Sequence, residues 1–335
     1  MTENKKQYKT KRITKQDMEE LTSQIDAKLL EFIKEGKYKD VLISMGNLGN
    51  YSLNNQIYIL MQNPNAQTVH GLKSWNNLGR HISKGEKAIT IFKPIIVKGE
   101  EEIKDKDGNK ILGDDGKPKT KQGYYCKGFQ AGYVFDISQT EGKQIDTFKF
   151  DKNKLVEDKD KILNALRNTI ESYGFSISYA TKEELGDGCY GLCNHQTNEI
   201  RILEGMSDLQ EISTTVHECG HALAHSAYRE DFEGLTVIEK REIKEVEAES
   251  IACVVCTYLG LDTQNFNFSY ITGWAEGDIS KFRKNLDVVS KHARTLIQGI
   301  EQELYLESKK EENKEVVSNL PFITNTTTQK EAVME

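Results

Sequence analysis

The sequence predicts an α+β protein of two domains, a small α+β domain followed by a mostly helical one. Its length of 335 residues favours two domains over one. Apolar residues recur at helical spacing near the N-terminus and through the C-terminal half, whereas β-type residues gather between them. We therefore expect domains at 1–148 and 149–308. The polar segment 309–335 has few apolar residues and is predicted to be a disordered tail.

The first domain is expected to contain helices and then strands. Residues 15–48 carry an apolar stripe at three- and four-residue steps, and SLNNQIYILMQ predicts a short helix between turn signals. Ile89, Ile91, Ile95 and Val97 predict a strand, and YYCKGFQAGYVFDIS predicts a second one. The segment 98–123 between them is almost all charge and glycine, which indicates a β-hairpin or a mobile loop.

The second domain is predicted to be mostly helical. Two short strands, FSISYA and NEIRILEG, interrupt the helical patterns. The predicted helices cover residues 153–174, 208–228, 239–259 and about 279–307.

Composition excludes several classes of protein. No apolar run is long enough to span a bilayer and the N-terminus lacks an apolar signal core, so we expect a cytoplasmic protein without a membrane partner. Six cysteines are too few for a disulfide scaffold. Cys189 and Cys193 lie near His195, but their spacing fits no strong zinc pattern, so reduced structural cysteines are expected.

Charge is distributed unevenly along the chain. Residues 1–94 hold 15 basic and 9 acidic side chains, whereas the whole chain has a net charge of −7. A basic front half on an acidic protein indicates an anionic partner for that half.

The stretch TVHECGHALAHSAY contains the pattern His-Glu-x-x-His. On a helix, His217 and His221 lie on one face and can place two imidazole nitrogens on one ion. Glu218 then lies beside the ion, where its carboxylate can hold and deprotonate a bound water. A catalytic Zn²⁺ site of this kind lowers the pKa of that water to about 7.

A catalytic zinc needs a third protein ligand and an open position. A third histidine six residues after the second is excluded because position 227 is alanine. The next helix offers Glu245 and Glu249, which share a face, whereas Glu247 points elsewhere. We assign Glu245 as the ligand and Glu249 as the residue that orients a ligating histidine. The order of these two roles stays open, and His225 is expected to be a packed or hydrogen-bonded histidine.

The alternative is an acidic surface helix that packs beside a helix with three histidines. A charged run such as KREIKEVEAE is ordinarily a solvated surface, and short motifs also arise by chance. The pattern of two histidines with paired glutamates on the next helix favours the metal site.

The segments HECGHALAH and KEVEAESIA resemble the gluzincin peptidases of the ImmA/IrrE kind and the peptidase domain of ArdC-type antirestriction proteins. The resemblance implies a zincin-like second domain, with zinc held by His217, His221 and Glu245, supported by Glu249, and with Glu218 as general base.

The front half is similar to the other part of the ArdC family. NYSLNNQIYIL, VHGLKSWNNLGRHISKGEKAITIFKPI and YVFDISQTEG resemble its N-terminal single-stranded-DNA-binding domain. Single strands bind through basic grooves with aromatic platforms. The candidate DNA-binding residues are Tyr51, Asn55, Lys73, Trp75, Arg80, Lys84 and Lys87. The alternative is that Trp75 is a core residue and the lysines only solubilise the surface.

Together the two halves resemble ArdC or LtrC-like proteins of plasmids and conjugative transposons, which implies protection of incoming DNA from restriction. Three hypotheses follow. The chain is an antirestriction factor that binds DNA, single-stranded by preference, and carries a zinc peptidase-like domain. Alternatively, it is a regulatory metalloprotease that cleaves a repressor or another protein substrate. Thirdly, it is a DNA-binding protein whose zinc is purely structural.

Overall fold

Two helices lie near the start of the described chain, after the short strand β1 (Arg12–Ile13). The computed structural model describes residues 12–103, 109–113, 115–145, 152–225, 229–266, 268 and 279–318. Helix α1 (Lys15–Lys34) begins at a capping box in which Thr14 and Asp17 bond each other's backbone amides. It ends before Gly36, whose φ of +70° is left-handed, and α2 (Tyr38–Asn47) follows. The helical pattern of residues 15–48 is therefore divided between two helices at this glycine.

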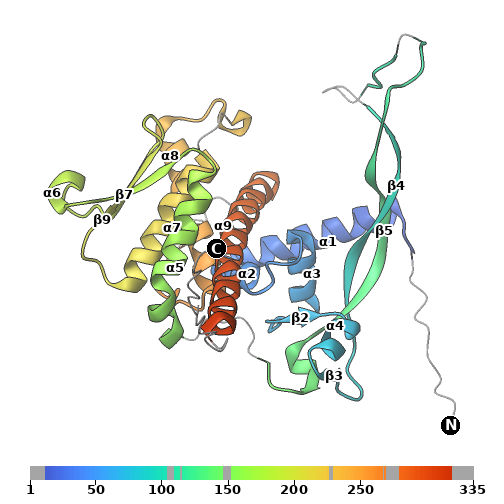
Figure 1. Ribbon diagram of the computed structural model, residues 1–335. Helices are drawn as coiled ribbons and strands as arrows, with labels where there is room; N and C mark the ends of the chain where they lie inside the picture. The colour runs from blue at the N-terminus through green and yellow to red at the C-terminus, as the bar shows by residue number, and fades with distance from the viewer. Residues whose placement is uncertain are drawn as a thin grey trace, which may run out of the picture.

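A long two-stranded ribbon extends away from the helices (Figure 1). It consists of β4 (Ile89–Glu102) and β5 (Thr120–Asp136), paired antiparallel from Ile89↔Val134 to Glu102↔Thr120. The segment 98–123, expected to be a hairpin or a loop, has its described ends paired as two antiparallel strands, and residues 104–108 and 114 lie outside the description. The short strands β1 (Arg12–Ile13) and β2 (Val69–His70) also pair with β5.

Short elements surround the base of this ribbon. Helix α3 (Leu53–Gln62) was predicted, whereas the others are too short to give a clear periodic signal. They are α4 (Leu72–Asn77), β3 (Arg80–Ile82), the 3₁₀ turn Ile137–Gln139 and β6 (Thr140–Gly142), which pairs with β3.

The C-terminal half places a small sheet beside a group of helices. Helix α5 (Lys152–Glu171) precedes a mixed sheet in the order β7-β9-β8, in which β8 is an edge strand. Its elements are β7 (Ser176–Ala180), α6 (Lys182–Leu185), β8 (Gly191–Asn194) and β9 (Glu199–Leu203). Helices α7 (Asp208–His225), α8 (Val237–Tyr258) and α9 (Ile279–Ser318) follow, with the 3₁₀ turn Glu230–Phe232 before α8.

The last helix is longer than predicted. Helix α9 runs to Ser318, past the end predicted near residue 307. The disordered tail expected over 309–335 stays a prediction, and residues 319–335 lie outside the described part of the chain. Within the described part of the chain, no helix has the length and apolar character needed to cross a membrane.

The main core joins the front helices to the C-terminal helices. Leu42 of α2, Val254 of α8 and Ile297 of α9 belong to one buried cluster. Gly46 permits close packing of α2 on α8, because a β-carbon there would lie 2.7 Å from Thr257 Cβ. The predicted domain boundary near residue 148 falls among residues 146–151, which the structure does not describe, and the division into two domains stays a proposal.

Candidate metal site

Helix α7 carries the two histidines of the motif on the side that faces α8. Its opposite positions, such as Ile212 and Val216, are fully buried, which fixes the rotation of the helix. Gly220 lies against Ala248 of α8, where an added β-carbon would come within 3.3 Å of the Ala248 backbone. The two helices therefore pack closely at the level of the histidines.

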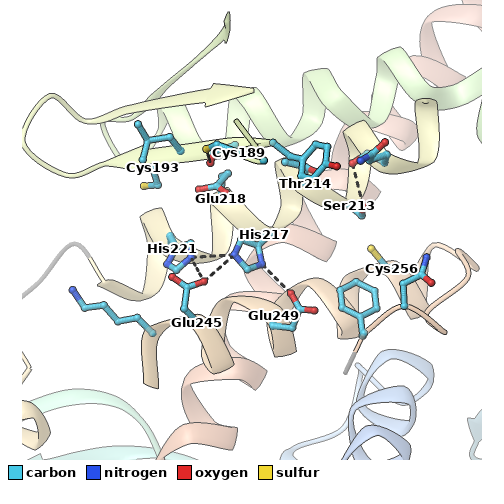
Figure 2. A pocket seen from close by; sticks show the side chains of 18 of the residues that line it. Cys189, Cys193, Ser213, Thr214, His217, Glu218, His221, Glu245, Glu249 and Cys256 are labelled. Atoms are coloured by element: carbon cyan, nitrogen blue, oxygen red, sulfur yellow. Dashed lines mark hydrogen bonds and ion pairs between the residues drawn. The ribbon is translucent and has the colours of Figure 1, made fainter. Parts of the chain in front are cut away.

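The described side chains bring three potential ligand atoms together (Figure 2). The Nε2 atoms of His217 and His221 lie 3.1 Å apart, and each lies 3.6 Å from Glu245 Oε2. One ligand atom from each of these residues lies within 4.8 Å of the others. Two nitrogens and a carboxylate oxygen form a candidate site for a divalent metal ion.

Glu249 contacts the other nitrogen of the first histidine. Its Oε2 lies 3.2 Å from His217 Nδ1, one helical turn from Glu245. A carboxylate at this position accepts a hydrogen bond from Nδ1–H and leaves Nε2 free to bind a metal. The structure therefore places Glu245 and Glu249 where the sequence-based assignment puts them, and their roles remain proposals.

Glu218 is buried between α7 and the edge strand β8. Burial raises the pKa of its carboxyl, while His217 and His221 and a hydrogen bond from the Cys193 backbone oppose the rise. Gly191 is required here, since a β-carbon would lie 2.9 Å from Glu218 Oε1. The carboxylate thus lies against the backbone of β8, beside the histidine pair.

The carboxylates around His217 favour a positive charge on its ring. Burial would lower the pKa of His217, but hydrogen bonds to Glu245 and Glu249 outweigh it and raise the pKa to about 10. Hydrogen bonds to His217 and, to a smaller extent, to His221 lower the pKa of the Glu245 carboxyl well below its usual range. A proton on His217 balances the carboxylates in the protein alone, and a divalent cation can replace it.

Metal binding is consequently expected to tighten as the pH rises. Below a pKa of about 10, a cation must displace the His217 proton. Release of one proton tightens the dissociation constant by about tenfold per pH unit. Titrations of the metal-free protein with Zn²⁺ in competition with a chelator, at several pH values between about 6.5 and 8, measure this slope. A dissociation constant that does not change with pH, after correction for the chelator, would contradict the prediction.

A cleft opens over the site between β8, α7 and α8. It has a volume of about 1480 Å³ and is bounded by Gly191, Cys193, Thr214, Lys240, Arg241 and Lys244 in addition to the metal-site residues. The three basic side chains form part of the α8 wall. Sequence reasoning missed both β8 and this wall, because β8 is short and the basic residues belong to a charged run that is typical of a solvated surface.

His225 is a hydrogen-bonded core residue, as expected. Its Nε2 lies 3.0 Å from Glu247 and its Nδ1 lies 3.1 Å from His221 Nδ1. Burial lowers its pKa to about 4, so the ring is neutral at pH 7. Position 227, where the sequence lacks a third histidine, lies outside the described residues.

The cysteines do not add a second metal cluster among the residues that the structure describes. The group formed by His217, His221 and Glu245 is the one found there. Cys193 Sγ lies 3.8 Å from His195 Nε2, and burial raises the Cys193 pKa to about 12, so the sulfur stays a thiol. Cys253 and Cys256 are buried in α8.

Four of the candidate DNA-binding residues make hydrogen bonds within the protein, and two of them, Trp75 and Asn55, are buried. Trp75 is 0% exposed and its indole N–H donates to Phe135 O, so its ring cannot stack on a base. Asn55 is buried and bonds both backbone groups of Phe92. Tyr51 donates its hydroxyl to Val69 O, and Arg80 directs its three donor nitrogens to Thr140 and Lys143. These side chains hold the fold together.

The remaining candidates, Lys73, Lys84 and Lys87, are exposed. Lys73 lies on α4, and the other two lie between β3 and β4. Their position leaves them free to meet an anionic partner, although exposed lysines also occur on surfaces without one. For Asn55 a sequence signal was present, because apolar and amide residues at helical spacing in α3 are typical of an internal face.

Fold and site together define an α+β chain with a candidate divalent-metal site of the His-Glu-x-x-His type. Residues 9–135 match the family model of the N-terminal domain of anti-restriction factor ArdC. This match confirms the resemblance of the front half, whereas the peptidase resemblance of the second half stays a proposal.

Distant similarities extend over more of the chain. An uncharacterized protein of Bacillus anthracis is 26% identical over 347 aligned positions, which cover 94% of this chain and 57% of that protein. The chain thus spans little more than half the length of this relative. Crystal structures of the antirestriction ArdC protein from the R388 plasmid are 17% identical. The metal-free form covers 75% of this chain and 83% of its own at a TM-score of 0.38. The Mn(II)-bound form covers 83% and 97% at a TM-score of 0.47.

Proposed function

We propose that His217, His221 and Glu245 bind Zn²⁺ in a zincin-like second domain and that the site hydrolyses peptide bonds. The observation that carries the proposal is the convergence of the three ligand atoms beside the buried Glu218, at the floor of an open cleft. Ligand atoms about 2.1 Å from a tetrahedral ion lie about 3.4 Å from one another. The distances of 3.1, 3.6 and 3.6 Å fit that arrangement.

When bound, zinc supplies an acidified water and polarises the substrate carbonyl. Glu218 then takes the proton of the attacking water at its carboxylate and returns it to the leaving amine. Its raised pKa brings the carboxyl closer to the pH at which it must both accept and donate a proton. Glu249 holds the His217 ring in place by accepting a hydrogen bond from its Nδ1–H.

The edge strand β8 supplies a place for an extended peptide. Tyr190 O accepts from Leu203 N–H, so in the antiparallel register Leu192 and Asn194 also direct their backbone groups toward β9. Gly191 and Cys193 direct theirs to the free side. The Cys193 amide bonds Glu218 there. A substrate that pairs with this edge would place its backbone along the cleft, over the metal site.

The cleft favours a catalytic over a purely structural metal. Structural zinc sites are closed by four protein ligands, whereas three ligands and an open side are typical of catalytic sites. The test is incubation of the zinc-loaded protein with a peptide library, followed by mass spectrometry. Cleavage that depends on added metal is expected, and an intact library at full zinc occupancy would contradict the hydrolytic function and favour the structural alternative.

We propose that the front half binds DNA, single-stranded by preference. We further propose that this binding serves an anti-restriction role, as the name of the matched ArdC family indicates for its members. The match over 9–135 and the exposed Lys73, Lys84 and Lys87 support it. A regulatory protease remains the alternative, in which the cleaved protein is the main target.

The triple substitution of Lys73, Lys84 and Lys87 by glutamate is expected to weaken binding to a single-stranded oligonucleotide and to reduce its salt dependence. Each lost phosphate contact lowers the slope of log affinity against log salt by about 0.7. Fluorescence anisotropy at several salt concentrations measures both quantities. The matched control is glutamate at Lys15, Lys28 and Lys34 of α1, which carries the same charge change away from α4 and β3. Equal losses in both variants would show that only overall charge matters.

A further inference from the structure

We propose that Glu247 and His225 are positioning residues that fix the ring of the metal ligand His221, in the way that Glu249 fixes His217. The inference deepens the proposed metal site and rests on it. It concerns a pair of buried side chains that the sequence pattern of the site does not include.

The contacts run in one line from the metal site into the core. His221 directs Nε2 toward the other ligand atoms and Nδ1 toward His225, at 3.1 Å. His225 directs its remaining nitrogen, Nε2, to Glu247 Oε2 at 3.0 Å. His221 and His225 therefore each use both ring nitrogens in this line of contacts.

The positions of the ring protons follow from this arrangement. A metal on His221 Nε2 requires the proton of that ring to lie on Nδ1. His225 Nδ1 must then accept that proton's hydrogen bond, so His225 carries its own proton on Nε2. Glu247 accepts that second bond as a carboxylate. The tautomer of the ligand is thus set by a carboxylate two hydrogen bonds away.

Glu247 is itself held in one place. It is 0% exposed and receives two hydrogen bonds from the Arg229 guanidinium, one of them at 3.0 Å to Oε1. Asn285 of α9 lies 3.5 Å from the same oxygen. The arginine balances the buried charge, as a buried carboxylate requires. Glu247 therefore offers His225 a fixed acceptor that does not move with solvent.

The two ligating histidines differ in their support. His217 is held directly by Glu249, whose side chain is 30% exposed, whereas His221 is held through a second histidine by a fully buried carboxylate. A structural role for the Glu247–Arg229 pair alone would not require an imidazole between Glu247 and the ligand. The continuous line of hydrogen-bond donors and acceptors from Glu247 through His225 to His221 supports a role in positioning the His221 ring.

The test compares two substitutions of His225 in the full chain. His225→Phe keeps the ring volume but removes both nitrogens, so His221 Nδ1 loses its acceptor. His225→Gln keeps one acceptor and one donor at similar spacing. Loss of an outer hydrogen bond to a metal ligand weakens metal binding by 10- to 100-fold. We expect that loss for His225→Phe, and a dissociation constant within about threefold of the parent for His225→Gln.

Zn²⁺ dissociation constants are measured by chelator competition, and the visible spectrum of the Co²⁺-loaded protein reports ligand geometry. His70→Phe is the matched control, a half-buried histidine on β2 that takes no part in the line of contacts. Melting of each metal-free variant reports folding separately. If His225→Phe is folded and binds zinc as the parent does, or if His225→Gln loses as much affinity as His225→Phe, the positioning role is wrong. Absence of zinc binding by the parent would instead overturn the proposed metal site.

Nitrogen-15 NMR of the histidine rings tests the tautomers directly, and it remains informative if His225→Phe fails to fold. In the zinc-loaded parent, His225 is expected to carry its proton on Nε2 and His221 on Nδ1. A proton on His225 Nδ1 would break the line of contacts and overturn the inference.

Discussion

Replacing Glu218 by glutamine is expected to leave the zinc content unchanged and to lower kcat on any cleaved peptide by about 10²- to 10⁴-fold. The amide has nearly the same shape but cannot accept the proton of the attacking water. Glu218 is not among the three converging ligand atoms, so the metal should stay bound. Steady-state kinetics and elemental analysis of the same preparation measure both quantities.

Glu242→Gln is the matched control, because Glu242 is an exposed residue of α8 and does not bound the cleft. Full activity in Glu218→Gln would exclude this carboxylate as the general base. The same variant also separates the functional hypotheses. If it still protects transferred DNA from restriction, hydrolysis is not needed for that role.

Removing the carboxylate of Glu245 is expected to weaken zinc binding more than removing that of Glu249. Glu245 Oε2 lies 3.6 Å from both ligating nitrogens, whereas Glu249 contacts the opposite nitrogen of His217. Loss of an orienting residue costs about 10- to 100-fold in metal affinity, and loss of a ligand is expected to cost more than about 100-fold. Chelator competition with Glu245→Ala and Glu249→Ala measures the difference.

Both substitutions should preserve the fold, because neither side chain is fully buried. Melting of the metal-free variants checks this. The reverse order of the two losses would assign Glu249 as the ligand and Glu245 as the orienting residue, which is the alternative that the spacing on α8 leaves open. Equal zinc content in the parent and in His217→Ala would remove the metal site altogether.

Helical periodicity was sufficient to place the metal-site residues on their elements. His217 and His221 share a face because they are four residues apart, and the same spacing brings Glu245 and Glu249 to one side of α8. These relations are local, so the sequence carries them. The closeness of α7 and α8 is a tertiary property, which Gly220 and Ala248 permit by their small size.

In the front half, by contrast, the sequence did not reveal which side chains face solvent. Trp75, Asn55, Tyr51 and Arg80 lie in a segment rich in aromatic, amide and basic groups, which is also the composition of a nucleic-acid surface. Composition does not say which way a side chain points. Packing directs Trp75 inward, where its indole N–H donates to Phe135 O, whereas Lys73, Lys84 and Lys87 are exposed to solvent.

The sequence by itself determined the α+β class, the helices of the metal site and the chemistry that two histidines and a glutamate can perform. Those features depend on residue type and on spacings of a few residues along one helix. Only the tertiary structure decided that β8 lies over Glu218, that His225 and Glu247 lie in line behind His221, and that α2 packs on α8. These contacts join residues far apart in the chain, and their energy comes from burial that no local pattern encodes.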